Sequence, residues 1–144
     1  MSESTNCARV FAIVLAAGAA TRFGANKQLA DYQGEPLVRR AVQLANAACG
    51  DRTVLVLGHE WQAIYKASKP LPGALVLNSG HARGIGTSIA SGVAAIRHAA
   101  DAVLVILADQ PLVTVGHLQD LQTTWGGGDR DIVASACLLY TSPS

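Results

Sequence analysis

The chain is poor in charge, aromatic residues and cysteine, and each shortage argues against a class of protein. Only 15% of its 144 residues are charged and the formal net charge is +1, so electrostatics give no reason to expect a nucleic-acid partner. Aromatic residues make up 5%, too few for the stacking platforms that bind single strands. The three cysteines are far apart and form no C-x-x-C pair, which argues against a disulfide framework or a zinc site.

Long apolar runs are also missing. No segment reaches the roughly 18 consecutive apolar residues that a membrane-spanning helix needs. The first nine residues are polar and lack the basic-then-apolar order of a signal peptide. We therefore expect a cytoplasmic protein without a membrane partner, and a flexible N-terminus over residues 1–9.

Half of the residues are apolar, and they occur as short runs that alternate with amphipathic segments. This alternation predicts a single three-layer α/β/α domain with a Rossmann-like, mostly parallel sheet. The runs predict strands over 10–15, 54–57, 74–77 and 103–107, and the start of a last strand over 132–134. Helical spacing predicts helices over 37–48, 59–68, 89–100 and 114–122, with Pro36 at a first helical position and a turn over 33–36.

The segment from Val10 to Lys27 is the most informative part of the chain. An apolar run that predicts a buried strand is followed directly by a loop of small residues. This loop contains Gly18 and Gly24, and its two cationic side chains are Arg22 and Lys27. Such a loop can point successive backbone N–H groups at phosphate oxygens. The alternative is a tight turn with two solvated cations. A Walker A loop and a dinucleotide fingerprint are both excluded, because the required lysine and glycine spacings are absent.

The residues Leu15-Ala16-Ala17-Gly18, Arg22, Gly24 and Lys27 resemble the LAAG-x-x-x-R-x-G-x-x-K signature of the MobA/MocA-like nucleotidyltransferases, among them the molybdenum cofactor cytidylyltransferases. Guanylyltransferase relatives usually read LAGG at the first four positions. The resemblance implies a MobA-like NTP transferase domain over residues 10–136, with the fold of the nucleotide-diphospho-sugar transferases.

The same resemblance implies a role for each matching residue. The residues that the resemblance implies for nucleotide binding are Leu15, Ala16, Ala17, Gly18, Arg22, Lys27, Gly84, Ser88 and Asp109. Arg22 and the loop backbone would hold the β- and γ-phosphates, Lys27 the α-phosphate, and Asp109 a Mg²⁺ ion. Gly84 and Ser88 match the family's base and ribose contacts. Arg22, Lys27 and Asp109 are thus the expected catalytic residues.

Three of the expected strands end in loops that carry these residues, after Leu15, after Leu77 and after Leu107. Ligands of open parallel sheets bind outside the carboxyl ends of the strands, so these loops are expected to converge on one crevice. Taken alone, Asp109 could equally be a turn or helix-capping aspartate, and Ser88 or Thr87 an ordinary helix cap.

The resemblance predicts transfer of CMP from CTP to the phosphate of molybdopterin-bound molybdenum, with release of pyrophosphate. A molybdoenzyme or its chaperone would then receive the product. The alternatives are a guanylyltransferase, a sugar- or alditol-phosphate nucleotidyltransferase, and a noncatalytic nucleotide-binding module. The family's second metal ligand has no match here. We hypothesise that the chain is incomplete at its C-terminus, with residues 137–144 a non-native tail.

Overall fold

A computed structural model describes residues 9–17, 29–58, 61–80, 84–110 and 112–125. The predictions that concern residues 1–8, 18–28, 59–60, 81–83, 111 and 126–144 lie outside this part of the chain. They include the flexible N-terminus up to residue 8, the strand start over 132–134 and the tail over 137–144. Within the described residues, no helix has the length and apolar character needed to cross a membrane.

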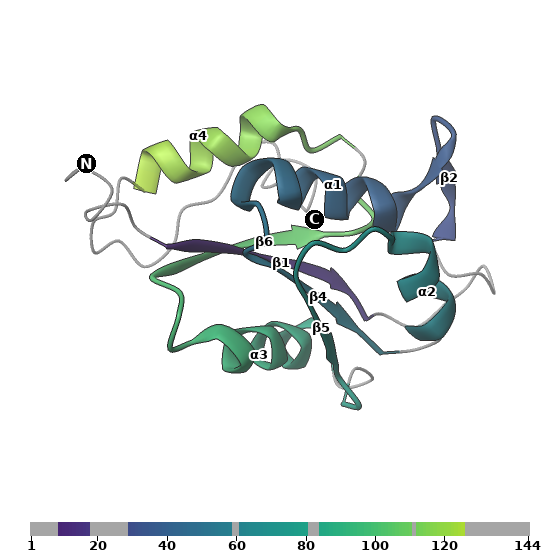
Figure 1. Ribbon diagram of the computed structural model, residues 1–144, viewed down its shortest axis with the longest axis horizontal. Coiled ribbons are helices and arrows are strands. Elements are labelled where there is room, and N and C mark those ends of the chain that lie inside the picture. The colour runs from purple at the N-terminus through teal and green to yellow at the C-terminus, as the bar shows by residue number, and fades with distance from the viewer. Residues whose placement is uncertain (1–8, 18–28, 59–60, 81–83, 111, 126–144) are drawn as a thin grey trace.

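A four-stranded parallel sheet forms the centre of the fold (Figure 1). The strands are β1 (Val10–Ala16), β4 (Thr53–Leu57), β5 (Ala74–Leu77) and β6 (Ala102–Leu107). Their order in the sheet is β5-β4-β1-β6, so β1 and β4 are central and β6 is added on the side of β1 opposite β4. The helices among the described residues are α1 (Leu37–Cys49), α2 (Trp61–Ser68), α3 (Ile85–Ile96) and α4 (Val115–Trp125).

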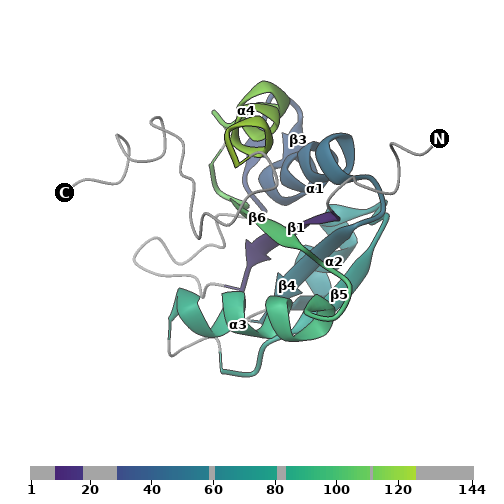
Figure 2. The ribbon, with the colours of Figure 1, turned by 90° about the vertical axis from the view of Figure 1, so that its left-hand side faces the viewer.

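Helices cover both faces of the sheet, as Figures 1 and 2 show: α1 and α4 lie above it and α3 lies below it. Along β1, Ala12, Val14 and Ala16 face the core formed with α1, while Ile13 and Leu15 face the core formed with α3. This two-sided burial explains why β1 is an uninterrupted apolar run and not an alternating one. The expected three-layer α/β fold with a parallel sheet is confirmed.

A small antiparallel hairpin joins β1 to α1. Its strands are β2 (Asp31–Tyr32) and β3 (Glu35–Pro36). Gln33 and Gly34 connect them with φ angles of 53° and 92°, the left-handed pair that tight hairpins favour. The predicted turn is therefore present, but Pro36 ends β3 and only precedes the first helical residue.

The third helix starts one turn before the range that the sequence analysis gives. The sequence predicts a helix over 89–100, whereas α3 runs from Ile85 to Ile96. The first turn consists of Ile85-Gly86-Thr87-Ser88. Glycine is a weak helix former, so this segment is typical of a loop when only the sequence is considered. Gly84 is the N-cap, with a φ of 118° that favours glycine and no side-chain cap. The prediction that Ser88 or Thr87 caps this helix is therefore wrong.

Candidate nucleotide site at the carboxyl edge of the sheet

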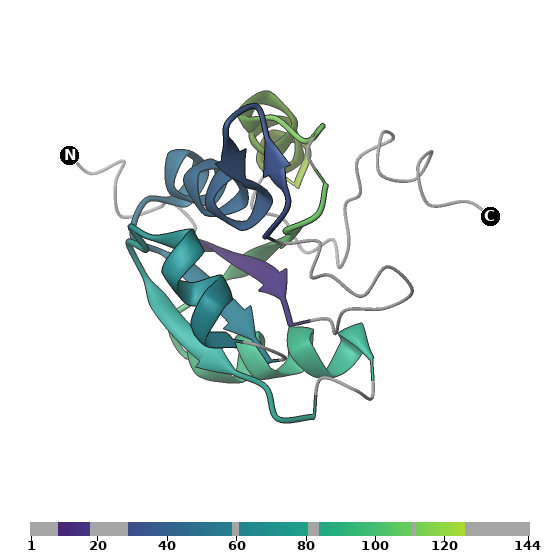
Figure 3. The same cartoon turned by 90° about the vertical axis from the view of Figure 1, so that its right-hand side faces the viewer.

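All four strands end at the same edge of the sheet, which faces the viewer in Figure 3. The register pairs Leu15 of β1 with Leu107 of β6 and Ala16 of β1 with Leu57 of β4. Leu57 in turn pairs with Leu77 of β5. The last residues of these strands are therefore paired side by side, and the loops after β1, β5 and β6 begin at the same edge of the sheet, as predicted.

The direction in which strands are added reverses between β1 and β6. The chain passes outward from β1 to β4 and β5, and then crosses below the sheet through α3 to place β6 on the other side of β1. Such a switch point leaves a crevice outside the carboxyl ends of the two strands, where open α/β sheets bind their ligands. Ala17 follows β1 at this point, and Asp109 lies two residues beyond the end of β6.

A backbone hydrogen bond fixes how Asp109 leaves the sheet. The Ala108 N–H donates to the Leu15 carbonyl oxygen at 3.0 Å, which extends the pairing of β6 with β1 by one residue. The Gln110 N–H donates to the Leu107 carbonyl oxygen at 3.2 Å and turns the chain sharply around Asp109. The Asp109 side chain is half-buried, and among the described residues it has no hydrogen bond or ion pair.

The beginning of the glycine-containing loop is a core segment. Leu15, Ala16 and Ala17 are at most 5% exposed, with the Ala16 side chain packed toward α1 and the Ala17 side chain toward α3. Leu15 and Ala16 belong to β1 and pair with its neighbours, so Ala17 is the first residue beyond the strand. Gly18, Arg22 and Lys27 lie outside the described residues, and their roles stay predictions.

The second loop brings Gly84 and Ser88 to the same edge through the first turn of α3. A Cβ atom added at Gly84 would meet nothing within 4 Å, so a side chain would fit in the available space. Glycine is favoured here because the φ angle of 118° is one that other residues rarely adopt. Ser88 is only 4% exposed, and its Oγ accepts a hydrogen bond from the Asn78 Nδ2 at 3.0 Å. The family roles of Gly84 and Ser88 stay predictions.

Asn78 is the polar residue at this edge that the sequence reasoning missed. It directly follows β5, is 7% exposed, and its backbone N–H donates to the Leu57 carbonyl oxygen at 2.7 Å. Its side chain bonds to both Thr87 and Ser88 of α3. An asparagine at a strand end followed by glycine two residues later is typical of an Asx turn, and this signal could have identified it.

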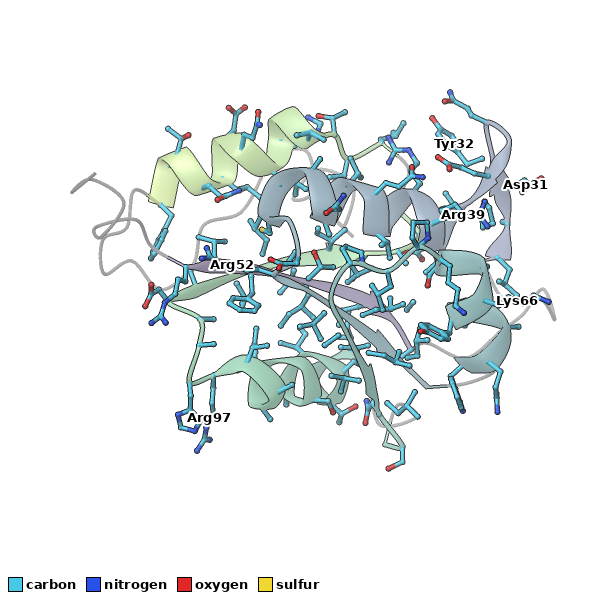
Figure 4. All side chains as sticks on the ribbon, in the orientation of Figure 1. Asp31, Tyr32, Arg39, Arg52, Lys66 and Arg97 are labelled. Atoms are coloured by element: carbon cyan, nitrogen blue, oxygen red, sulfur yellow. The ribbon has the colours of Figure 1, made fainter. Side chains whose placement is uncertain are left out.

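Arg40 of α1 holds the loop after β6 from above. Its Nη1 donates to the Val113 carbonyl oxygen at 3.1 Å, and its guanidinium carbon lies 5.5 Å from the centre of the Tyr32 ring. Figure 4 shows Tyr32 at the hairpin, beside the start of α1. Arg40 therefore joins the hairpin, α1 and the segment that carries Asp109.

Among the described residues, no three His, Cys, Asp or Glu side chains form a metal-binding group. A Mg²⁺ ion needs no such group when it is bound with a nucleotide, because one or two carboxylates and the substrate's phosphates commonly hold it. Asp109 lies at the switch point, and its carboxylate, which has no partner in the part of the chain that the structure describes, fits that donor set. Two groups with displaced pKa values, Cys49 and Asp101, lie at the opposite edge, where the strands begin.

Comparison with known families agrees with this architecture. The model of the MobA-like NTP transferase domain matches residues 12–138, which is most of the chain. The chain belongs to the MobA-like NTP transferase family. The matched range contains every candidate site residue, from Leu15 to Asp109. The coarse assignment to a nucleotidyltransferase superfamily is thus confirmed.

One curated relative is the nicotine blue oxidoreductase of Paenarthrobacter nicotinovorans. The two chains are 36% identical over 113 residues, which cover 76% of this chain and 55% of the relative. The chain thus spans about half the length of that relative. This relative carries the name of an oxidoreductase and not of a transferase.

Solved structures with the same fold include a nucleotidyl transferase from Methanothermobacter, with a TM-score of 0.72 and 24% identity over 80% of this chain and 57% of the other. Rv0371c from Mycobacterium tuberculosis H37Rv gives a TM-score of 0.65 and 26% identity over 83% of this chain and 61% of the other. Rv0371c has also been solved in complex with manganese.

Proposed function

We propose that the chain transfers a nucleotidyl group from a nucleoside triphosphate to a phosphorylated acceptor and releases pyrophosphate. The observation that carries the proposal is the pairing of β1 with β6, which brings Ala17 and Asp109 to one switch point. Family membership supports the same activity. The reaction would take place in the cytoplasm.

The reaction needs a site that gathers and neutralises phosphate charge. An oxygen of the acceptor phosphate attacks the α-phosphorus, and the bond from that phosphorus to the oxygen bridging to the β-phosphate breaks. Arg22 and the backbone of Ala16, Ala17 and Gly18 would hold the β- and γ-phosphates, and Lys27 would stabilise charge at the α-phosphate. The in-line arrangement of acceptor and leaving group is the main contribution of such a site.

Asp109 would hold a divalent ion against the phosphates. When bound, Mg²⁺ supplies positive charge that stabilises the departing pyrophosphate. The carboxylate of Asp109 is open to such a ligand, and the manganese complex of Rv0371c supports a divalent ion in a protein of this fold. Magnesium is proposed as the ion used here.

CTP is the proposed donor and molybdopterin-bound molybdenum the proposed acceptor, with a molybdoenzyme or its chaperone as the recipient of the product. The proposal of CTP rests on Ala17, which stands where guanylyltransferases tend to have glycine. One methyl group cannot set the base by itself. GTP, with the same acceptor or with a sugar or alditol phosphate, is therefore the next combination to test.

A pyrophosphate-release assay tests the proposal. The chain, and a chain extended beyond residue 144, would be given ATP, CTP, GTP or UTP with Mg²⁺ and each candidate acceptor. We expect release that depends on both CTP and acceptor, and the Lys27→Ala variant provides the inactive control. Release with GTP in place of CTP would overturn the choice of base. Binding of a nucleotide without release by either chain would favour the noncatalytic module.

A second candidate function is redox chemistry on an aromatic substrate, which the 36% identity with the nicotine blue oxidoreductase favours. The test follows the absorption of nicotine blue with a reduced nicotinamide dinucleotide. Enzyme-dependent loss of the dye, together with no pyrophosphate release, would move the chain into this class.

A further inference from the structure

The base of the loop between β5 and α3 is closed by one buried side chain, that of Asn78. Gly80 fixes the orientation of the Asn78 amide, because a backbone N–H can only donate and its partner at 2.9 Å must therefore be Oδ1. The amide nitrogen consequently faces α3. Its two hydrogens go to the Thr87 Oγ1 at 2.9 Å and the Ser88 Oγ at 3.0 Å.

Thr87 completes the closure. Its Oγ1 lies 3.0 Å from the Gly80 carbonyl oxygen and 2.7 Å from that of Gly84, so it is within hydrogen-bond distance of both ends of the loop. Asn78 and Thr87 therefore hold residues 80 and 84 together. The start of α3 is fixed by this polar closure in the absence of a side-chain cap.

The contact with Asn78 also decides what the Ser88 hydroxyl can do. Because Ser88 Oγ accepts a hydrogen from Asn78, its own hydrogen must be donated to another partner. In the part of the chain that the structure describes, Ser88 has no acceptor for that hydrogen. A hydroxyl that is 4% exposed with an unused donor is unusual in a folded protein and points to a ligand.

We propose that Asn78 is a positioning residue that closes the β5–α3 loop and directs the Ser88 hydrogen toward an oxygen of the bound nucleoside. This inference rests on the proposed function for its ligand, and on the hydrogen bonds above for its geometry. Asn78 itself touches no ligand in this scheme. It acts through Ser88, and the two side chains should therefore behave as one unit in nucleotide binding.

The first experiment is a double-mutant cycle in the full chain, with the dissociation constant of CTP and Mg²⁺ measured by titration calorimetry. We expect Asn78→Ala and Ser88→Ala each to weaken binding about tenfold, as loss of a buried hydrogen bond commonly does. The double variant should be no weaker than either single one. Ser91→Ala is the matched control, since its Oγ only donates to the Thr87 carbonyl oxygen within α3.

The Asn78→Asp variant separates the two parts of the proposed role of Asn78, which are to close the loop and to direct the Ser88 hydrogen. An aspartate can accept from the Gly80 N–H and from the Ser88 hydroxyl, while the single Thr87 hydrogen stays on the loop carbonyls. The loop thus stays closed, but the Ser88 hydrogen now points at the carboxylate. Hydrogen exchange in the first turn of α3 should stay slow, while CTP binding falls about tenfold. In a Ser88→Ala background the same change should have little further effect, whereas simple charge repulsion would weaken binding there as well.

Two outcomes would overturn the inference. Additive losses in the cycle would make Asn78 a merely structural residue, and unaltered binding in Asn78→Ala would remove it from the site. If the wild-type chain bound neither CTP nor GTP, the proposed function would fail separately. Hydrogen exchange in Asn78→Ala would then decide on the closure alone: faster exchange in the first turn of α3 supports it, and unchanged exchange overturns it.

Discussion

The loops that follow β5 and β6 leave the same edge of the sheet, but their polar residues are held in different ways. Asn78, after β5, is 7% exposed and uses its backbone N–H, its amide oxygen and both amide hydrogens within the protein. Asp109, after β6, is half-buried, and among the described residues its carboxylate has no partner. The backbone around Asp109 is nevertheless fixed, through Leu15 and Arg40.

This difference separates a positioning residue from a ligand-binding residue. A buried amide with every donor used cannot bind a substrate without breaking existing bonds, and such groups hold structure in place. A carboxylate on a fixed backbone, without a partner among the described residues, can bind a cation without breaking a bond within that part of the protein. The two loops are therefore expected to respond differently to substitution.

The largest expected effect is that of Asp109→Asn. The amide keeps the size of the side chain but loses the charge that would hold Mg²⁺, so transfer should fall about 100-fold or more. Thermal unfolding without nucleotide should be unaltered, because the carboxylate has no partner to lose among the described residues. Asp120→Asn, an exposed change on α4, is the matched control. An unaltered Mg²⁺ response in Asp109→Asn would return this residue to a turn-forming role.

The next effect is expected at Gly92, where α3 approaches the sheet closely. A Cβ atom there would lie 3.0–3.1 Å from side-chain atoms of Ile13 and Val56, both fully buried. Gly92→Val should therefore lower the free energy of unfolding by about 1–3 kcal/mol and displace the loop after β5. Chemical denaturation measures the loss. Gly86→Ala, where an added Cβ meets nothing within 4 Å, should cost no stability.

The Gly92 variant also sharpens the contrast between the loops. Because α3 carries Ser88, nucleotide affinity should fall in Gly92→Val, while the Mg²⁺ concentration for half-maximal activity, measured at saturating nucleotide, should stay the same. A change in the Mg²⁺ requirement of similar size would show that the two loops form one mechanical unit, contrary to the proposal.

A smaller effect is expected at Arg40, which holds the loop after β6. Arg40→Ala removes the bond to the Val113 carbonyl oxygen and the contact with Tyr32, and should cost about 1–2 kcal/mol of stability. It should also raise the Mg²⁺ requirement, since the backbone around Asp109 becomes less fixed. The control is Arg39→Ala, because the Arg39 Nε donates at 3.0 Å to the Ala67 carbonyl oxygen at the end of α2. An equal Mg²⁺ response in both variants would contradict this role for Arg40.

The sequence predicted what depends on local pattern. The apolar runs located all four strands of the sheet to within a residue at each end. Burial on both faces explains the uninterrupted runs of β1 and β4, whereas β5 and β6 are apolar throughout although Leu77 and Val105 are exposed. The order and register of the strands then placed Asp109 beside the end of β1, as the three converging loops had suggested. Gly50 follows the first helix as a local C-terminal signal, with a φ of 65° and its N–H donating to the Asn46 carbonyl oxygen.

Features that depend on distant contacts could not be predicted in the same way. The start of α3 at Ile85 is hidden by Gly84 and Gly86, which are typical of a loop, although Ile85 continues the helical spacing of Ile89 and Val93. Asn78 meets Ser88 only when that first turn is helical, so its role was missed together with the helix start. The partner of Arg40, at Val113, is 73 residues away and leaves no local signal.

The smallest expected effect lies at the edge of the sheet farthest from both loops. Burial raises the pKa of the Cys49 thiol to about 11 from an ordinary value of 9.0, and the nearby Arg52, labelled in Figure 4, partly opposes this. The folded state thus favours the neutral thiol. Its contribution to stability is fully present below pH 9 and is lost as the pH rises toward 11.

Cys49→Ala should accordingly flatten the dependence of stability on pH between about 9 and 11, measured by chemical denaturation at each pH. In the wild-type chain, mapped alkylation at pH 8.5 should be slow at Cys49, because little thiolate is present there. Nucleotide affinity should be the same in both chains, since the strands begin at this edge and end at the other. A change in CTP binding on substitution of Cys49 would show that the two edges of the sheet are coupled, and the contrast between the loops would then extend through the whole domain.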